Sequence, residues 1–243
     1  MGTTVKPYNK ENTSKKEEVA EMFDNISVKY DFLNHFLSLG IDKIWRKKAV
    51  KILGKVKPKV ILDMATGTGD FAIESLKLNP TKIVGVDLSN GMLEVGRKKM
   101  IKKNIDHIIE MHQGDSENLN FETNTFDGFT VGFGVRNFQD LSKGLSELLR
   151  VLRPGGIGVI LEFSKPTNPL LDKIYDAYSF KLLPKIGELV AKDGDSYQYL
   201  AESIRMHPDQ STLKGMMEEA GFERCQVNNL TGGIVAVHTG YKL

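Results

Sequence analysis

Short apolar runs alternate with amphipathic stretches along most of the 243-residue chain. From residue 59 onward, the apolar runs predict five strands, and the stretches between them carry apolar residues at helical spacing. The strands are expected at 59–64, 82–87, 108–113, 126–132 and 157–163, and the helices at 69–78, 89–103 and 141–152. Strands that alternate with helices are typical of a parallel sheet with right-handed crossovers. We therefore expect an α/β protein.

The last third of the chain departs from this alternation. Residues 169–206 are rich in Leu and aromatic side chains and predict an inserted helical lid. A helix is expected over Ser211–Ala220, because a glycine that fits a helix stop follows it. Two further runs, Cys225–Leu230 and Ile234–Tyr241, flank a Thr-Gly-Gly turn and predict a C-terminal antiparallel hairpin.

The first 56 residues precede the alternating pattern. Residues 1–15 are polar and charged and predict a disordered leader, whereas residues 16–56 predict an N-terminal helical cap near the site. Residues 16–243 are expected to form a single domain. The chain has no uninterrupted apolar stretch of about eighteen residues, so we expect neither a standard secretion signal nor a membrane span.

Charge and cysteine content narrow the class of protein. The formal net charge is +2 and the pI is near 8.4, a balance that does not indicate a nucleic-acid partner. Apolar residues at helical spacing interrupt the basic stretches 46–48 and 97–103, which are predicted to be solvated helix faces. Cys225 is the only cysteine, so no internal disulfide can form and a cytoplasmic location is expected.

A glycine-rich turn follows the first predicted strand. Gly67, Thr68 and Gly69 form this turn, and its Gly-x-Gly-x-x-Ala spacing also fits a dinucleotide-binding fingerprint. Asp63 ends the strand and Asp70 follows the turn, which places carboxylates where a pyrophosphate would have to bind. Carboxylates repel an anion and attract the sulfonium and ammonium groups of S-adenosylmethionine (SAM). The turn therefore favours SAM over NAD.

The next two strands also end in polar residues. Asp87 ends the second strand, where a carboxylate can accept hydrogen bonds from ribose hydroxyls. Asp115 and Ser116 follow the third strand, where they can hydrogen-bond an adenine edge. Acidic residues at three strand ends predict a cofactor site at the carboxyl edge of the sheet. The alternative is that each Asp simply begins a loop.

Five further segments carry ordered motifs. They lie at Tyr30 to Trp45, Phe133 to Asn137, Arg150 to Ser164, Tyr197 to Gln210 and Asn229 to Ile234. Together with the glycine turn, they resemble the menaquinone/ubiquinone C-methyltransferase family from about residue 23 to the C-terminus. The resemblance implies a class I SAM-dependent methyltransferase fold, which is Rossmann-like, and methylation of a ring carbon of a polyprenylated quinol.

The resemblance also assigns individual positions. It implies cofactor contacts at Thr68, Asp87, Asp115 and Ser116. The chain departs from the family pattern at four positions: Leu33, where Met is frequent, Asp42, where His is frequent, His207, where Phe is frequent, and Gly132, where some members carry Ser. Any catalytic role tied to Asp42 or His207 is therefore in doubt.

Methylation of an aromatic carbon is helped when an adjacent hydroxyl, whose free pKa is about 10, loses its proton. Arg136 lies just past the fourth strand, at the edge where ligands bind in open α/β sheets, and is our candidate for stabilising the phenolate. Its alternative role is to pair with a nearby acid. Further candidates for orienting the quinol or relaying the proton, each of which could equally be a packing or turn residue, are Tyr30, Asn34, Tyr197 and Tyr199. The five histidines are scattered, so we expect no metal requirement.

A polyprenylated quinol partitions into lipid, so peripheral contact with the inner face of the membrane is expected. The lid is the candidate for this contact, since its apolar residues alternate with Lys173, Lys181 and Lys185. The alternative is a lid folded onto its own core. A homo-oligomer is left open.

We predict C-methylation of demethylmenaquinol to menaquinol. The ubiquinone precursor 2-methoxy-6-polyprenyl-1,4-benzoquinol is an alternative acceptor, because the motifs fit both ring types. A methyltransferase acting on another lipophilic phenol or sterol is a second hypothesis. A non-catalytic SAM-binding subunit of a quinone-synthesis complex is a third.

Overall fold

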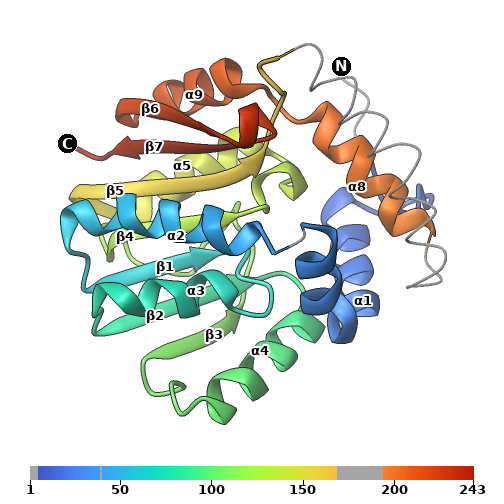
Figure 1. Cartoon of the computed structure of the whole chain (residues 1–243), viewed down its shortest axis with the longest axis horizontal. Coiled ribbons are helices and arrows are strands. Elements are labelled where there is room, and N and C mark those ends of the chain that lie inside the picture. Colours follow the sequence, from blue (N-terminus) through green and yellow to red (C-terminus); the bar gives the residue numbers. More distant parts are fainter. Residues whose placement is uncertain (1–4, 39, 169–193) are drawn as a thin grey trace.

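The computed structural model has a central seven-stranded sheet with helices on both faces (Figure 1). It describes residues 5–38, 40–168 and 194–243 and, within these ranges, only the backbone of residues 29–37, 194, 195 and 197. The strands are β1 (Val60–Met64), β2 (Lys82–Asp87), β3 (Ile109–Gln113), β4 (Phe126–Gly132), β5 (Leu152–Phe163), β6 (Glu223–Leu230) and β7 (Val235–Tyr241). Their order is β3-β2-β1-β4-β5-β7-β6, and β7 runs antiparallel to both of its neighbours. The predicted parallel sheet and C-terminal hairpin are thus confirmed.

The helices of the described ranges cover the two faces of the sheet and its carboxyl edge (Figure 1). They are α1 (Lys15–Leu37), α2 (Asp42–Leu53), α3 (Asp70–Ser75), α4 (Asn90–Lys102), α5 (Leu141–Val151), α8 (Gly194–Met206) and α9 (Gln210–Glu219), with short 3-10 turns η1 (Gly54–Val56), η2 (Leu76–Leu78), η3 (Val135–Asn137) and η5 (Thr231–Gly233). Helices α5 and α9 pack in one apolar cluster on one face of the sheet, and α2, α3 and α4 pack in a second cluster on the other face. Because both faces are covered, the central strands are mostly apolar and can be recognised in the sequence as short apolar runs.

Strand β5 begins earlier than predicted. The expected helix 141–152 and strand 157–163 leave Arg153-Pro-Gly-Gly156 between them, but β5 already starts at Leu152. Leu152 pairs with Phe126, and the ladder resumes with Gly128 opposite Ile157. The segment is therefore a bulge within an extended strand, and Gly155, at a φ of +81°, supplies the left-handed residue that the bulge requires.

Within the expected N-terminal helical cap, a helical pattern over residues 17–25 predicts a shorter helix than α1, which continues to Leu37. Of the predicted lid, residues 169–193 lie outside the described residues, and the remainder forms α8. No helix in the described ranges is both long and apolar enough to cross a bilayer.

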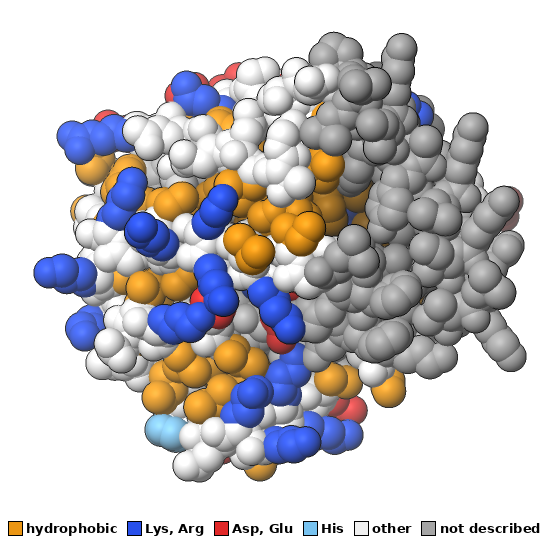
Figure 2. Space-filling model, viewed as in Figure 1, with side chains coloured by type: hydrophobic (Ala, Val, Ile, Leu, Met, Phe, Trp, Pro, Cys, Tyr) orange, Lys and Arg blue, Asp and Glu red, His pale blue; other side chains and the backbone are white. Residues whose placement is uncertain are grey.

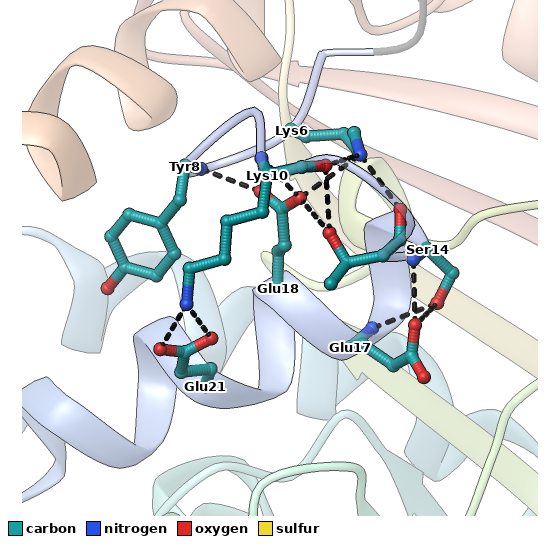
Figure 3. A network of polar contacts seen from close by, with 8 residues as sticks. Lys6, Tyr8, Lys10, Ser14, Glu17, Glu18 and Glu21 are labelled. Carbon is teal, nitrogen blue, oxygen red and sulfur yellow. Dashed lines mark hydrogen bonds and ion pairs between the residues drawn. The ribbon is translucent and has the colours of Figure 1, made fainter.

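The N-terminal segment differs from the predicted disordered leader. Residues 5–14 lie against α1 because Glu18, whose side chain is fully buried, binds them (Figure 3). Its carboxylate accepts hydrogen bonds from the backbone N–H of Tyr8 at 2.7 Å and of Lys10 at 3.0 Å, and from the hydroxyl of Thr13. It also pairs with Lys6 at 3.1 Å. Burial alone would raise the pKa of Glu18, but these contacts outweigh burial and lower the pKa to about 2.

Candidate active site

A pocket lies at the carboxyl ends of β1, β2 and β4, beside α1. Its wall on the α1 side consists of Val19, Ala20 and Phe23. The sheet contributes the residues that follow each strand, which are Met64, Ala65, Gly67, Asp87, Leu88, Ser89, Ser116, Gly132, Phe133, Gly134, Asn137 and Phe138, with Met92 from α4. This is the edge at which open α/β sheets bind ligands.

The glycine turn is held in a conformation that only small residues adopt easily. Gly67 and Gly69 have φ angles of +56° and +86°. A Cβ atom on Gly69 would come within 2.2 Å of the Met100 side chain, so the turn also packs tightly against α4. The N–H of Gly67 donates to the Asp87 carboxylate at 2.8 Å. This donor is therefore already used and is not offered to a pyrophosphate.

Asp63 lies beneath the turn and not in the pocket. The side chain is buried, and one carboxylate oxygen accepts from the Thr66 hydroxyl at 2.6 Å and from the Ala72 N–H at 3.2 Å. The other oxygen accepts from the Thr130 hydroxyl at 2.7 Å. Burial raises the pKa of Asp63 to about 6, against these hydrogen bonds. Asp63, expected as a direct cofactor contact, instead positions the turn, because all of these donors belong to β4, the turn and the start of α3.

Asp87 is at the predicted place for a ribose contact. It lines the pocket, and its carboxylate accepts from the N–H groups of Gly67 and Ser89, the latter at 2.9 Å. Burial raises the pKa of Asp87. A carboxylate has about four lone-pair directions, so it keeps acceptor capacity for hydroxyl groups in the pocket.

The other predicted cofactor residues divide into two groups. Ser116 is buried and lines the pocket, as does Gly67. Asp115 is tied to the protein, because its carboxylate accepts from the Glu117 N–H at 2.9 Å and pairs with Lys16 at 2.7 Å. Thr68 is buried outside the pocket lining, and its hydroxyl accepts from Lys99 at 2.9 Å.

Helix α1 closes the pocket through contacts that the sequence reasoning missed. The Lys15 ammonium donates to the carbonyls of Arg136 at 2.7 Å and Phe138 at 3.0 Å. Burial and the nearby Arg136 charge lower the pKa of Lys15 to about 8. Farther along α1, Asp24 accepts from the Ser89 hydroxyl at 2.6 Å and from the Gly91 N–H at 2.8 Å. The sequence does carry one indication that α1 forms this wall: Val19 and Phe23 lie four residues apart, which puts both apolar side chains on one face of the helix.

Arg136 lies in η3, just past β4, with its side chain only 7% exposed. Its guanidinium pairs with the fully buried Glu162 at 2.8 Å, donates to the Phe133 carbonyl, and lies 5.5 Å from the ring centre of Phe163. Among the described residues its Nε has no hydrogen-bond partner. Glu162 is thus the acidic partner expected in the alternative interpretation. Arg136 does not itself line the pocket, but its neighbours Phe133 and Asn137 do.

Of the four residues predicted to orient the quinol or relay the proton, only Tyr199 has a described side chain. Tyr199 is buried, and its hydroxyl donates to the side-chain oxygen of Asn137 at 3.0 Å, which links α8 to the pocket wall. Burial raises the pKa of Tyr199, so it stays protonated. Tyr30 and Asn34 fall in the backbone-only part of α1, and the side chain of Tyr197 is likewise outside the described structure.

His207 is buried and not an exposed loop residue. Neither ring nitrogen has a partner among the described residues. Burial, with the Arg136 and Lys15 charges, lowers the pKa of His207 to about 3, which makes it a weak proton acceptor. In the described part of the chain, no group of three His, Cys, Asp or Glu side chains is placed to hold a metal ion.

The pocket residues suit SAM on chemical grounds. Asp87 offers acceptors for ribose hydroxyls, Ser116 offers a hydroxyl at the predicted adenine position, and the turn withholds the Gly67 donor that a phosphate would use. Gly132 contributes backbone alone, since a Cβ atom there would lie 2.7 Å from the Phe71 ring.

Comparisons with known proteins agree with this chemistry. The chain resembles a SAM-dependent methyltransferase of Thermotoga maritima with a TM-score of 0.62 at 20% identity, over 92% of this chain and 99% of the other. It also resembles a phosphoethanolamine N-methyltransferase of Haemonchus contortus, solved in complex with SAM, with a TM-score of 0.55 at 23% identity, over 76% of this chain and 38% of the other. The fold is that of class I SAM-dependent methyltransferases, and the cofactor is SAM.

Sequence relatives are much closer. A ubiquinone/menaquinone biosynthesis C-methyltransferase UbiE of Klebsiella pneumoniae is 49% identical over 230 residues, which cover 94% of this chain and 92% of that protein. The protein of the same name from Stutzerimonas stutzeri is 48% identical over 232 residues, covering 95% and 91% of the two chains. Residues 11–242 match the ubiE/COQ5 methyltransferase family. The chain therefore belongs to the ubiE/COQ5 methyltransferase family.

Proposed function

We propose that this protein transfers a methyl group from SAM to a ring carbon of demethylmenaquinol, giving menaquinol and S-adenosylhomocysteine. The observation that carries the proposal is the match to relatives named as quinone-biosynthesis C-methyltransferases, 49% identical over 94% of the chain. The same relatives support the 2-methoxy-6-polyprenyl-1,4-benzoquinol precursor of ubiquinone as the alternative acceptor. Membrane contact and a cytoplasmic location at the inner leaflet belong to this proposal, because the substrate carries a lipid-soluble tail.

The chemistry assigns a role to the β4–β5 side of the pocket. Bound SAM supplies an electrophilic methyl group, and the acceptor carbon must be electron-rich to attack it. A cationic hydrogen-bond donor near the quinol hydroxyl favours the phenolate and hence the electron density on the ring. We assign this role to Arg136, directly or through water, because it is buried beside the pocket wall and its Nε is without a partner among the described residues.

Glu162 gives Arg136 its position. A fully buried carboxylate in β5 would be unfavourable alone, and the 2.8 Å pair fixes the guanidinium next to η3. Asn137 and Tyr199 extend this arrangement, since the 3.0 Å hydrogen bond between them fixes the Asn137 side chain in the pocket wall. Tyr199 therefore serves as a positioning residue in this proposal.

The test is methyl transfer from labelled SAM, under reducing conditions in detergent, to demethylmenaquinol and to the benzoquinol precursor side by side. Transfer to the first acceptor supports the proposal, and transfer to the second alone would assign the protein to ubiquinone synthesis. SAM binding without transfer to either quinol would contradict both and favour a non-catalytic subunit.

A further inference from the structure

The outer face of α2 carries a local excess of positive charge. Residues 41–59, which cover α2 and the loop after it, carry eight basic side chains and one acidic side chain. The rest of the chain carries 25 basic and 30 acidic side chains. The segment therefore carries an excess of seven positive charges, whereas the rest of the chain carries an excess of five negative charges. Figure 2 looks at this face and shows many Lys and Arg side chains and few acidic ones.

Most of the basic side chains on this segment have no acidic partner among the described residues. Six exposed lysines have side chains that make no ion pair or hydrogen bond with any described residue. They are Lys43, Lys47, Lys48, Lys51, Lys55 and Lys57. Several lysines elsewhere on the surface are paired, as in the contacts of Lys82 with Glu110 at 2.9 Å and of Lys214 with Glu218 at 3.3 Å. We define the six lysines as the α2 lysine face.

Neighbouring acids do not neutralise this face. The only acid of α2, Asp42, is turned inward and pairs with the buried Arg46. On the adjacent helix α3, Asp70 pairs with Lys99 at 2.9 Å and Glu74 pairs with Lys77. The prediction that residues 46–48 form a uniform solvated face is therefore incomplete, since Arg46 lies in the core and the lysines around it face solvent.

Apolar side chains accompany the cations at the end of α2 nearest the pocket. Ile44 is 53% exposed and Ile41 is 36% exposed, although both are large and apolar. The next residue, Trp45, is buried with its ring centre 6.1 Å from that of Phe133, which lines the pocket. Exposed isoleucines next to unpaired lysines therefore lie one aromatic contact away from the site.

We propose that the α2 lysine face, with Ile41 and Ile44, docks on an anionic lipid bilayer. Lysines attract acidic headgroups, and isoleucines at the same end enter the boundary between headgroups and acyl chains. All six cations are lysines, which act as point charges suited to a diffuse anionic surface and lack the bidentate geometry by which arginine reads a nucleic-acid phosphate. The buried face of α2 stays in the core, so the helix lies on the bilayer and does not cross it.

The contact deepens the proposed function, because a docked α2 presents the pocket edge to a quinol dissolved in the bilayer. The docking itself does not depend on that function. Vesicles without any quinol therefore test the contact, and soluble and membrane-embedded quinols then test its use.

The experiment is sedimentation of the full chain with phosphatidylcholine vesicles prepared with and without phosphatidylglycerol. The test variant is Lys43→Glu/Lys47→Glu/Lys51→Glu, one stripe of α2. The matched control is Lys143→Glu/Lys214→Glu/Arg224→Glu, which makes the same charge change on α5, α9 and β6, away from α2. Glu and Lys are similar helix formers, so α2 is expected to remain folded in the test variant, and circular dichroism and SAM binding check this.

We expect the natural protein to bind only the anionic vesicles and to lose binding as salt rises. The α2 variant should bind at least about a hundredfold more weakly, since each lysine near an anionic surface contributes about a factor of five. The control should bind like the natural protein. Equal binding by the α2 variant, equal binding to neutral vesicles, or binding to duplex DNA or RNA in place of vesicles would each overturn the proposal.

Turnover separates this proposal from the proposed function. The α2 variant should methylate a short-chain soluble quinol at the normal rate and a vesicle-embedded quinol slowly. If the natural protein methylates neither quinol, the proposed function fails while the vesicle result stands by itself.

Discussion

The two halves of the pocket edge are built differently. On the β1–β2 side, the buried carboxylates already accept hydrogen bonds, Asp63 from three donors and Asp87 from two backbone N–H groups. On the β4–β5 side, buried polar atoms of Arg136, Ser164 and His207 have no partner among the described residues. In the proposed function, cofactor recognition is thus preorganised by the backbone of consecutive segments, whereas acceptor recognition depends on side chains brought together from distant ones.

The largest effect should come from the β4–β5 side. Arg136→Ala should lower kcat by about a hundredfold or more and leave the Kd for SAM within a few fold, because the lost interaction is made mainly in the transition state. Steady-state kinetics and calorimetry measure the two quantities. Arg136→Lys keeps the charge without the planar fork and should recover only part of the rate.

Arg150→Ala is the matched control for this change. Arg150 also pairs with a glutamate, Glu147, at 2.7 Å, but on α5 and outside the pocket lining. The Arg150→Ala substitution should therefore leave kcat unchanged. If Arg136→Ala keeps its kcat and only lowers the melting temperature, the Arg136–Glu162 pair is structural and the contrast between the two halves fails.

The next effect should come from the β1–β2 side and should fall on binding. Asp87→Ala removes the acceptor of two backbone N–H groups and of the ribose hydroxyls, so the Kd for SAM should rise by about tenfold to a hundredfold. Asp87→Asn keeps one acceptor oxygen, so its Kd for SAM should lie between those of the natural protein and Asp87→Ala. A SAM titration in which Asp87→Ala binds as tightly as the natural protein would remove Asp87 from the cofactor site.

A stability effect of intermediate size should come from the buried Glu18. Its pKa is lowered to about 2 in the folded protein, so its stabilising contribution is present above the ordinary glutamate value and is lost as pH falls toward 2. Glu18→Gln should therefore lower the free energy of unfolding by about 1–2 kcal/mol at pH 7 and by almost nothing near pH 2.

Denaturant unfolding at several pH values tests this expectation, with Glu21→Gln as control. Glu21 lies on the same helix and pairs with Lys10 at 2.6 Å, but that pair is exposed and should contribute less than about 1 kcal/mol. A loss on Glu18→Gln that does not change with pH would show that the carboxylate charge is not what holds residues 5–14.

The smallest effect is expected at Ser116. Ser116→Ala removes one hydroxyl from the pocket lining and should weaken SAM binding by a few fold, about 1 kcal/mol or less. The same calorimetric titration as for Asp87 measures it. A loss as large as that of Asp87→Ala would show that the adenine side contributes as much as the ribose side.

Local patterns account for what was predictable. Strands β1, β2, β4 and β5 were found because each contains an apolar run buried on both faces. Asp87 and Ser116 were found because they lie at or just after strand ends. Glu162 was overlooked as the partner of Arg136, although a carboxylate inside the apolar run Ile157–Phe163 must have a buried partner.

Other contacts had no local signal. Lys15 contacts η3 across more than a hundred residues of sequence, and Asp24 caps a turn on α4. Such pairs depend on how the layers pack, which periodicity does not encode. Asp63 was placed at the right strand end, but whether a carboxylate faces a ligand or its own turn depends on where Thr66 and Thr130 direct their hydroxyls.

The attachment of residues 5–14 to Glu18 bears on how the protein is best handled. A tag attached at that end would lie close in sequence to these contacts and to Val19, Ala20 and Phe23, which form the α1 wall of the pocket. The other terminus follows β7, whose last residues pair with the start of β5 at the amino edge of the parallel strands, opposite the pocket. Leu243 is 55% exposed there, so purification handles and fluorescent labels are better fused to the C-terminal end.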